Sequence, residues 1–293
     1  MEMKKTYISA FTAIFFWSTM AVTTKLLLGE HNNLQVLWAS SFFAGFALVI
    51  YNIISGDIKK LRVYSLKDYV VSILISLPGT FFYHILYQAG ADLLPASQAF
   101  IINYLWPIMS VLFACIILKE KMTFRKVVAI GISFLGVIVV TSGELLHFNK
   151  TTLLGALFCM LGAVSYGLFT ALNQKKNYEK GITVMMGYMV SFVLTTAINA
   201  YKGDLFIPTI SQTFGFAWNG IFTMAIATTL WVIALSGGKT AKISNLAYIT
   251  PFLSLVWTGL ILKEKLSILS VAGLVIIVLG IFIQLKGKEI EKE

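Results

Sequence analysis

The sequence predicts an all-α membrane protein with ten transmembrane helices, arranged as two inverted five-helix repeats around a central cavity. Three observations support this prediction. The 293-residue chain is 58% hydrophobic and only 12% charged, which is too apolar for a soluble domain of this size. Ten segments are long and apolar enough to cross a bilayer. A pattern around Pro107 returns without a gap around Pro251, 144 residues later.

The predicted spans follow from the thickness of the bilayer, which needs about 20 apolar residues per helix. They are residues 6–28, 34–54, 68–91, 95–118, 124–141, 152–173, 181–201, 213–236, 241–262 and 268–286. The first span follows Lys4 and Lys5 and reaches Leu28 without a small-residue cleavage site. We therefore expect a retained helix there and not a signal peptide.

The internal repeat divides the chain into residues 1–147 and residues 148–293. The run Ile-Leu-Lys-Glu-Lys at 117–121 returns at 261–265. A fixed period without gaps indicates duplication and not merely shared composition. Each half holds five predicted spans, an odd number, so the two halves must cross the membrane in opposite directions. Inverted repeats of this kind are typical of alternating-access transporters.

The basic residues predict the orientation. With the N-terminus inside, 18 of the 23 Lys and Arg residues fall on the cytoplasmic side, and five remain outside: Lys25, Lys150, Lys202, Lys263 and Lys265. This bias predicts a multi-pass protein of the cell (inner) membrane with both termini in the cytoplasm. The net charge of +10 is then an orientation signal. The expected partners are the lipid bilayer and a small-molecule substrate, with no nucleic acid.

Several kinds of chemistry lack the residues they need. All 13 acidic residues fall in predicted loops or at span ends, so there is no buried carboxylate to serve as a proton site near the midplane. Cys115 and Cys159 stand singly, without the spacing of metal ligands. No HExxH, CxxC or GxSxG motif lies at a membrane face. The sequence therefore predicts no enzyme, no metal and no cofactor.

The third span contains the one ionisable side chain well inside a predicted helix, His84. Tyr83, Tyr87 and Gln88 share its helical face, because residues three and four apart are neighbours. A buried polar group at membrane depth predicts function, although a histidine satisfied by a nearby carbonyl is the alternative. Pro78-Gly79 just before this face predicts a kink and a hinge.

The fourth span combines polar and aromatic residues with a proline, in the order Asn103, Tyr104, Trp106 and Pro107. Pro107 cannot donate to the carbonyl of Asn103, and a freed carbonyl is tolerated where a cavity or a neighbour satisfies it. The second copy again places polar groups beside a proline, at Tyr248 and Pro251. A packing kink would explain one such proline. Two at matching positions favour a central site, with both prolines as hinges.

Two halves of five spans, each with a proline-containing fourth helix and an Ile-Leu-Lys-Glu-Lys exit, resemble the drug/metabolite transporter superfamily in its EamA-type branch. The resemblance covers nearly the whole chain. It implies a ten-helix basket around a central cavity and solute transport without a prosthetic group.

The pattern Tyr83-His84-x-x-Tyr87, followed by Tyr104-x-Trp106, resembles the bacterial aromatic amino acid exporters of that branch. This resemblance implies that these five residues line the substrate path, together with an aromatic residue of the sixth span, here Tyr166. The expected function is export of amino acids, aromatic or otherwise neutral, or of related small metabolites. Export of cationic drugs is the alternative. A membrane-embedded enzyme or a scramblase is the alternative from another class.

Overall fold

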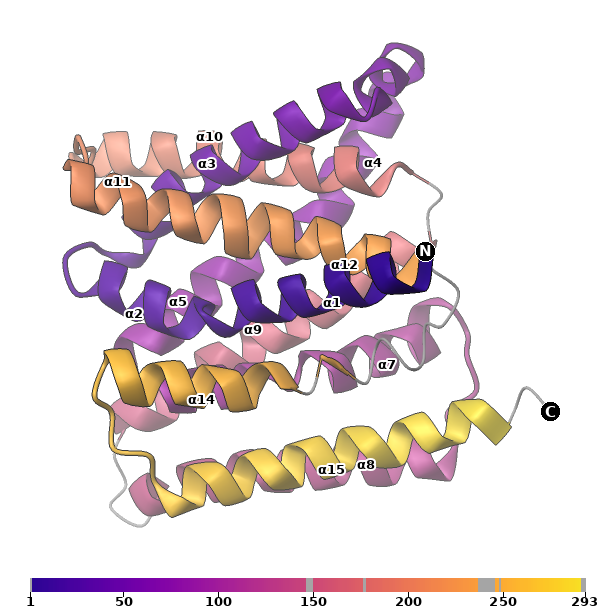
Figure 1. Cartoon of the computed structure of the whole chain (residues 1–293), viewed down its shortest axis with the longest axis vertical. Coiled ribbons are helices and arrows are strands. Elements are labelled where there is room, and N and C mark those ends of the chain that lie inside the picture. Colours follow the sequence, from indigo (N-terminus) through magenta and orange to yellow (C-terminus); the bar gives the residue numbers. More distant parts are fainter. Residues whose placement is uncertain (1, 146–149, 176–177, 237–245, 248, 291–293) are drawn as a thin grey trace.

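The computed structural model describes residues 2–145, 150–175, 178–236, 246–247 and 249–290, and every regular element in that part of the chain is helical (Figure 1). Seven of these helices are long and apolar enough to span a membrane. Their bounds are Thr6–Leu28, Asn33–Ile54, Leu66–Leu93, Ala96–Ile117, Phe124–Thr141, Lys150–Lys175 and Lys180–Lys202. They match the first seven predicted spans to within a few residues.

Twelve helical elements make up the first seven spans and the connection between the second and the third. These are α1 (Glu2–Ser18), α2 (Met20–Leu28), α3 (Asn33–Ile54), the 3-10 helix η1 (Asp57–Val63), α4 (Leu66–Leu77), the π-helix η2 (Pro78–Phe82), α5 (Tyr83–Leu93), α6 (Ala96–Asn103), α7 (Trp106–Ile117), α8 (Phe124–Leu145), α9 (Lys150–Lys175) and α10 (Lys180–Lys202). The remaining elements are α11 (Ile210–Ala217), the π-helix η3 (Trp218–Ile226), α12 (Ala227–Ser236), α14 (Ile249–Ile261) and α15 (Ile268–Ile290). The start of the predicted ninth span, 241–245, lies outside the described residues.

Capping boxes define where three of the helices begin. The Asn32 side chain accepts from the backbone N–H of Gln35, whose own side chain accepts from the backbone of Asn32. Ser65 with Asp68 and Thr209 with Gln212 make the same reciprocal contacts. Each box satisfies backbone donors that the first helical turn leaves free. These helices therefore begin at polar residues just outside the apolar runs.

Two helical runs contain a π-helical segment at matching places in the repeat. The first, η2, begins at Pro78, and Ser165 Oγ donates to the Pro78 carbonyl at 2.7 Å. The segment 144 residues later, 222–226, lies within η3. π-Helical segments within α-helices are frequent at functional sites. The kink predicted at Pro78-Gly79 is thus a π-bulge, and both residues lie in it.

Proline also interrupts the next span. α6 ends at Asn103 and α7 begins at Trp106, so the helix is broken at Tyr104 and Leu105 just before Pro107. The lost backbone donor predicted this break. Pro251 is buried in the first turn of α14.

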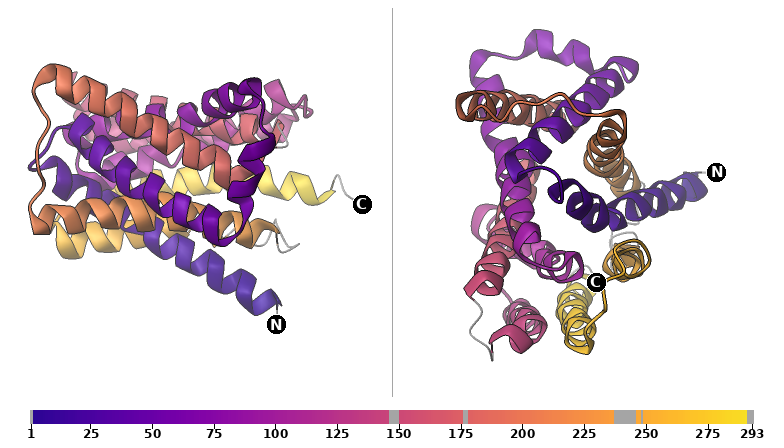
Figure 2. Two further views of the ribbon diagram at one scale, coloured as in Figure 1. Left: turned by 90° about the horizontal axis from the view of Figure 1, so that it is seen from above. Right: turned by 90° about the vertical axis from the view of Figure 1, so that its left-hand side faces the viewer.

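The two halves pack through repeat-related helices. α8 and α15 lie side by side along one edge of the bundle, and α3 and α10 lie at the opposite edge (Figures 1 and 2). Ser133 Oγ donates to the carbonyl of Ile277, 144 residues away, at 3.3 Å. Contacts between equivalent residues are expected close to a pseudo-two-fold axis between repeats.

The exits of α7 and α14 share one backbone conformation. Lys119 and Lys263 have φ of 60° and 54°, and they are the two non-glycine residues with positive φ in the described chain. The connections that carry them lie at opposite ends of the bundle, whereas α1 begins and α15 ends at the same end (Figure 1). The duplicated Lys-Glu-Lys run therefore adopts the same turn at both ends of the molecule.

Candidate functional site

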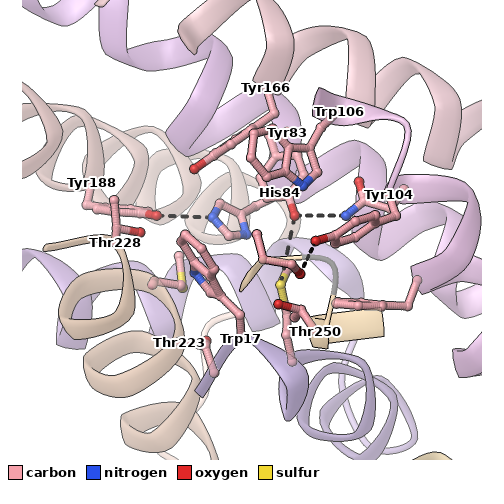
Figure 3. A pocket seen from close by; sticks show the side chains of 15 residues that line it. Trp17, Tyr83, His84, Tyr104, Trp106, Tyr166, Tyr188, Thr223, Thr228 and Thr250 are labelled. Carbon is pink, nitrogen blue, oxygen red and sulfur yellow. Dashed lines mark hydrogen bonds between the residues drawn. The ribbon is translucent and has the colours of Figure 1, made fainter. Parts of the chain in front are cut away.

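A cavity at the centre of the bundle brings most of the predicted substrate-binding residues together (Figure 3). Six of the eight line it: Tyr83, His84, Asn103, Tyr104, Trp106 and Tyr166. They come from three helical runs: α5 follows the π-bulge, α6 and α7 flank the proline break, and α9 packs against both runs. The two irregular helices thus place their side chains on one cavity wall.

Hydrogen bonds fix the polar side chains of this cavity. His84 Nε2 and the Tyr188 hydroxyl are joined at 3.1 Å, and Asn103 Nδ2 donates to the Tyr83 hydroxyl at 3.0 Å. The hydroxyl of Tyr104 donates to the carbonyl of Ala247, just before α14. This last contact joins the proline-broken helix of the first half to the chain at the equivalent place in the second half (Figure 3).

Three buried polar atoms on the cavity wall have no hydrogen-bond partner among the described residues. They are His84 Nδ1, Asn103 Oδ1 and Thr250 Oγ1. Their side chains are only 4%, 3% and 2% exposed, respectively. Because buried polar groups in proteins are normally paired, these atoms have hydrogen-bonding capacity that a ligand or water in the cavity would satisfy.

Aromatic rings form the rest of the wall. The ring of Tyr166 lies 4.8 Å from that of Tyr83 and 5.2 Å from that of Trp106, between ring centroids. Trp17, from α1, packs against Trp231 at 5.4 Å. In Figure 3 the rings of Tyr83, Trp106 and Tyr166 group on one side of His84, with Trp17 on another. Such faces suit both aromatic and cationic groups.

The central cavity is narrow, with about 50 Å³ of free space, and it joins a wider vestibule of about 400 Å³. Trp17, Trp106, Tyr166 and Thr228 line both spaces. These four residues are called the throat below. The vestibule walls include the last turns of α3 and α9 and the start of α10, which lie toward the end of the bundle where α1 begins (Figure 1).

A charged cluster lies at the vestibule mouth. Lys60 Nζ is 2.6 Å from a carboxylate oxygen of Glu179, which lines the vestibule, and 2.8 Å from Asp57. The hydrogen bond from Lys60 lowers the pKa of Asp57 below its usual range, and the bonds to Asp57 and Glu179 raise the pKa of Lys60. Asp57 and Lys60 are therefore charged at neutral pH.

The central cavity has a different character, because its described lining contains no Asp, Glu, Lys or Arg. Nor does the described part of the chain contain a group of three or more His, Cys, Asp or Glu side chains arranged to hold a metal ion. The arrangement offers neutral hydrogen-bonding groups and π faces to a ligand.

The structure does not bring every predicted residue to the cavity. Tyr87 is fully buried behind Tyr83, with stacked rings 6.1 Å apart. Tyr248 lies outside the described residues. Pro78 and Gly79 lie behind the cavity wall. The ring of Phe169 packs so closely against Gly79 that a Cβ added at this position would meet the ring.

Tyr188, Trp17 and Thr250 line the cavity but are not among the predicted substrate-binding residues, although Thr250 stands beside Pro251 in the second copy of the repeat. A buried imidazole needs a partner, and that need was the one signal pointing to a residue such as Tyr188. Tyr188 lies within an apolar stretch of α10, and nothing in its local pattern marks it. Its role follows from the packing of α10 against α4 and η2, which brings its hydroxyl to His84.

Comparisons with known proteins agree with this architecture. The model of the EamA-like transporter family matches residues 4–142 and again residues 153–285. A crystal structure that is 22% identical superimposes with a TM-score of 0.68 over 95% of this chain and 96% of that one. At this identity the likeness shows a shared fold.

Curated relatives are similar over most of their length. An uncharacterised transporter of Archaeoglobus fulgidus is 26% identical over 231 residues, which cover 76% of this chain and 79% of that protein. The uncharacterised transporter YoaV of Bacillus subtilis is 22% identical over 293 residues, covering 96% of each chain. The aromatic amino acid exporter YddG of Ancylobacter novellus is 26% identical over 251 residues, covering 83% of this chain and 84% of that protein. Since the family model matches both halves of the sequence, the chain belongs to the EamA-like transporter family.

Proposed function

We propose that this transporter exports amino acids, aromatic or otherwise neutral, or related small zwitterionic metabolites. The observation that carries the proposal is the composition of the central cavity, which combines aromatic rings with neutral hydrogen-bonding groups and has no charged residue in its described lining. A zwitterion has no net charge, so its transfer into a site without charged residues costs less free energy than the transfer of an isolated ion. The name of the Ancylobacter novellus relative supports the same substrate class.

In this proposal the unpartnered polar atoms hold the charged ends of the substrate. Asn103 Oδ1 accepts a hydrogen bond from the ammonium group, and Thr250 Oγ1 and His84 Nδ1 are placed to bond its carboxylate or ammonium. The faces of Trp106 and Tyr166 stack on an apolar or aromatic side chain. The free space of about 50 Å³ is smaller than an aromatic amino acid, so the throat must widen as the substrate enters from the vestibule.

Alternating access would use the two inverted five-helix repeats, 1–147 and 148–293, in a ten-helix arrangement. The shared 144-residue spacing of the π-bulges and of the Lys119 and Lys263 turns supports this arrangement. The bulges and the prolines at 107 and 251 would act as hinges. The vestibule opens at the end where α1 begins, the end that the basic residues assign to the cytoplasm of a cell-membrane protein. In the proposed export cycle, the substrate enters the protein from that side.

A cationic drug is the second candidate. Trp17, Trp106 and Tyr166 present aromatic rings around the throat, and ring faces attract cations even without a carboxylate. The lack of a described acidic group in the cavity favours the zwitterion, because a lone cation there would lack a counter-charge.

The test is a counterflow screen of the purified protein in proteoliposomes against the twenty amino acids and a few cationic dyes. Neutral amino acids should exchange, and dyes should not. Trp106→Ala and His84→Ala should then abolish exchange although both proteins still reach the membrane. Trp38→Ala is the matched control, because Trp38 donates a hydrogen bond to Thr196 of α10 and does not line the cavity. Undiminished flux from both cavity variants contradicts the assignment.

A further inference from the structure

The end of the bundle opposite the vestibule is held by two charged side chains that the proposed substrate site does not use. Glu264 belongs to the second Lys-Glu-Lys run, and its two carboxylate oxygens accept from the backbone N–H groups of Ala96 and Ser97 at 2.6 and 3.1 Å. These are the first residues of α6. The contact therefore joins the α14–α15 connection of the second half to a helix of the first half.

Lys25 of α2 makes hydrogen bonds to the turn that precedes α6. Its Nζ donates to the carbonyls of Ala91 and Leu94 at 2.7 and 2.8 Å, at the end of α5 and in the turn that leads to α6. Lys25 thus makes its hydrogen bonds inside the protein. Together, Glu264 and Lys25 fix the α5–α6 turn to two other elements.

α6 connects this turn to the cavity. The helix has eight residues and so is about 12 Å long. It begins at the Glu264 contact and ends at Asn103, which lines the cavity. A carboxylate at a helix N-terminus satisfies free backbone donors and complements the helix dipole. Loss of this contact would free α6 at the end away from the vestibule.

The equivalent residue of the first repeat makes no such contact among the described residues. Glu120 stands 144 residues before Glu264, next to Lys119, which has the same left-handed backbone as Lys263. Its carboxylate lies 3.2 Å from Lys126, within its own hairpin, and is 37% exposed. Residues 240 and 241, which stand 144 residues after Ala96 and Ser97, lie outside the described residues.

We propose that Glu264 is a positioning residue of the transport cycle, whose contact with the N-terminus of α6 keeps the cavity closed at the end opposite the vestibule. Breaking that contact is a required step in opening the cavity at that end. This inference rests on the proposed transport function, because only a transporter needs the second opening.

The experiment measures access to the closed end without any substrate. A single cysteine replaces Thr24, which is fully buried and lies one helical turn beyond Met20, a cavity residue, toward the Lys25 end of α2. The background carries Cys115→Ser and Cys159→Ala, which remove the two native cysteines. A membrane-impermeant maleimide is added on the side opposite the vestibule, and the labelling rate is measured. A cysteine at Thr170, in the vestibule wall, is labelled in a separate sample with the same maleimide added on the vestibule side, and reports that each variant is folded.

Glu264→Gln should raise the labelling rate at position 24 about five-fold, as expected when a helix cap is lost. The labelling rate at position 170 should stay within about two-fold of the rate measured with Glu264 present. A modest shift in population changes the fraction of the conformation with the open vestibule only a little. Lys25→Met should act in the same direction and serves as the test if Glu264→Gln does not reach the membrane. Glu120→Gln is the matched control and should not raise labelling at position 24.

An unchanged labelling rate in both Glu264→Gln and Lys25→Met overturns the proposal. An equal increase in Glu120→Gln overturns it too, since that result indicates general loosening of the exit turns. Because the readout needs no substrate, it is separate from the counterflow screen. A negative counterflow screen together with an increased labelling rate at position 24 would refute amino acid export but would still support the proposed role of Glu264.

Discussion

His84 Nε2 and the Tyr188 hydroxyl, 104 residues apart in the chain, form a buried hydrogen bond of 3.1 Å across the cavity wall. The bond leaves Nδ1, on the opposite side of the ring, without a described partner. Tyr188 thus sets which imidazole nitrogen is left for a ligand and in which direction the ring points. In the proposed transporter, Tyr188 orients the group that contacts substrate.

The first prediction concerns this bond. Tyr188→Phe leaves His84 Nε2 unpaired or lets the ring turn, and an unpaired buried polar group costs about 1–3 kcal/mol. Counterflow at low substrate concentration should fall about ten-fold, corresponding to about 1.4 kcal/mol. Tyr69→Phe is the control, because the Tyr69 hydroxyl bonds the Leu61 carbonyl near η1 and is remote from the cavity. Equal fluxes from the two variants would show that the bond has no part in transport.

The sequence was sufficient for features that depend on local rules. The proline break at Tyr104 and Leu105 follows from a missing backbone donor, and the matching exit turns at Lys119 and Lys263 follow from the duplication. The face of α5 that carries Tyr83 and His84 follows from helical periodicity. These rules involve only residues close together in the chain or related by a fixed spacing.

Features that depend on packing between distant helices could not be predicted in the same way. Tyr87 shares a helical face with Tyr83, yet it is buried behind it and does not line the cavity, because the cavity exposes only part of that face. Tyr188 and Trp17 reach the cavity from α10 and α1. Their places depend on how helices cross, which no local pattern encodes.

The second prediction concerns the throat. Thr228 lines both the central cavity and the vestibule, whereas its neighbour Thr229 lines the vestibule alone. Thr228→Met adds bulk where the path is narrow and should reduce flux at least ten-fold, since overfilling a packed site is costly. Thr229→Met makes the same chemical change in the wide vestibule and should retain most of the flux. Rates are compared in proteoliposomes at equal protein content. Similar losses in both variants would place the constriction elsewhere.

The third prediction concerns pH. His31, in the α2–α3 loop, stacks on Phe206 with ring centroids 4.4 Å apart. Burial lowers the pKa of His31 below its ordinary value near 6.5, and the nearby Glu30 opposes this only partly. As the pH falls below 6.5, the unfolded chain takes up the proton before the folded protein does, so stability decreases toward the lower folded pKa. The melting temperature in detergent should therefore fall between about pH 8 and pH 5.5.

His31→Phe keeps an aromatic ring against Phe206 and removes the titrating group. Its melting temperature should fall less than that of the unmodified protein over the same pH interval. The difference between the two slopes isolates His31 from the other histidines, which both proteins retain. If the two slopes coincide, His31 does not carry the pH dependence.

The last prediction concerns the packing of α8 against α15, the repeat-related pair at one edge of the bundle. A Cβ at Gly136 would lie 2.8 Å from the Gly273 carbonyl oxygen and 2.9 Å from the Ile277 backbone nitrogen, whereas a Cβ at Gly131, on the same helix, would meet nothing within 4 Å. Gly136→Ala must push the helices apart and should cost about 1–3 kcal/mol. Gly131→Ala should be neutral or stabilising, because alanine favours a helix by about 1 kcal/mol over glycine. Thermal unfolding in one detergent compares them, and a Gly136→Ala protein as stable as Gly131→Ala would mean that the two helices do not pack this closely.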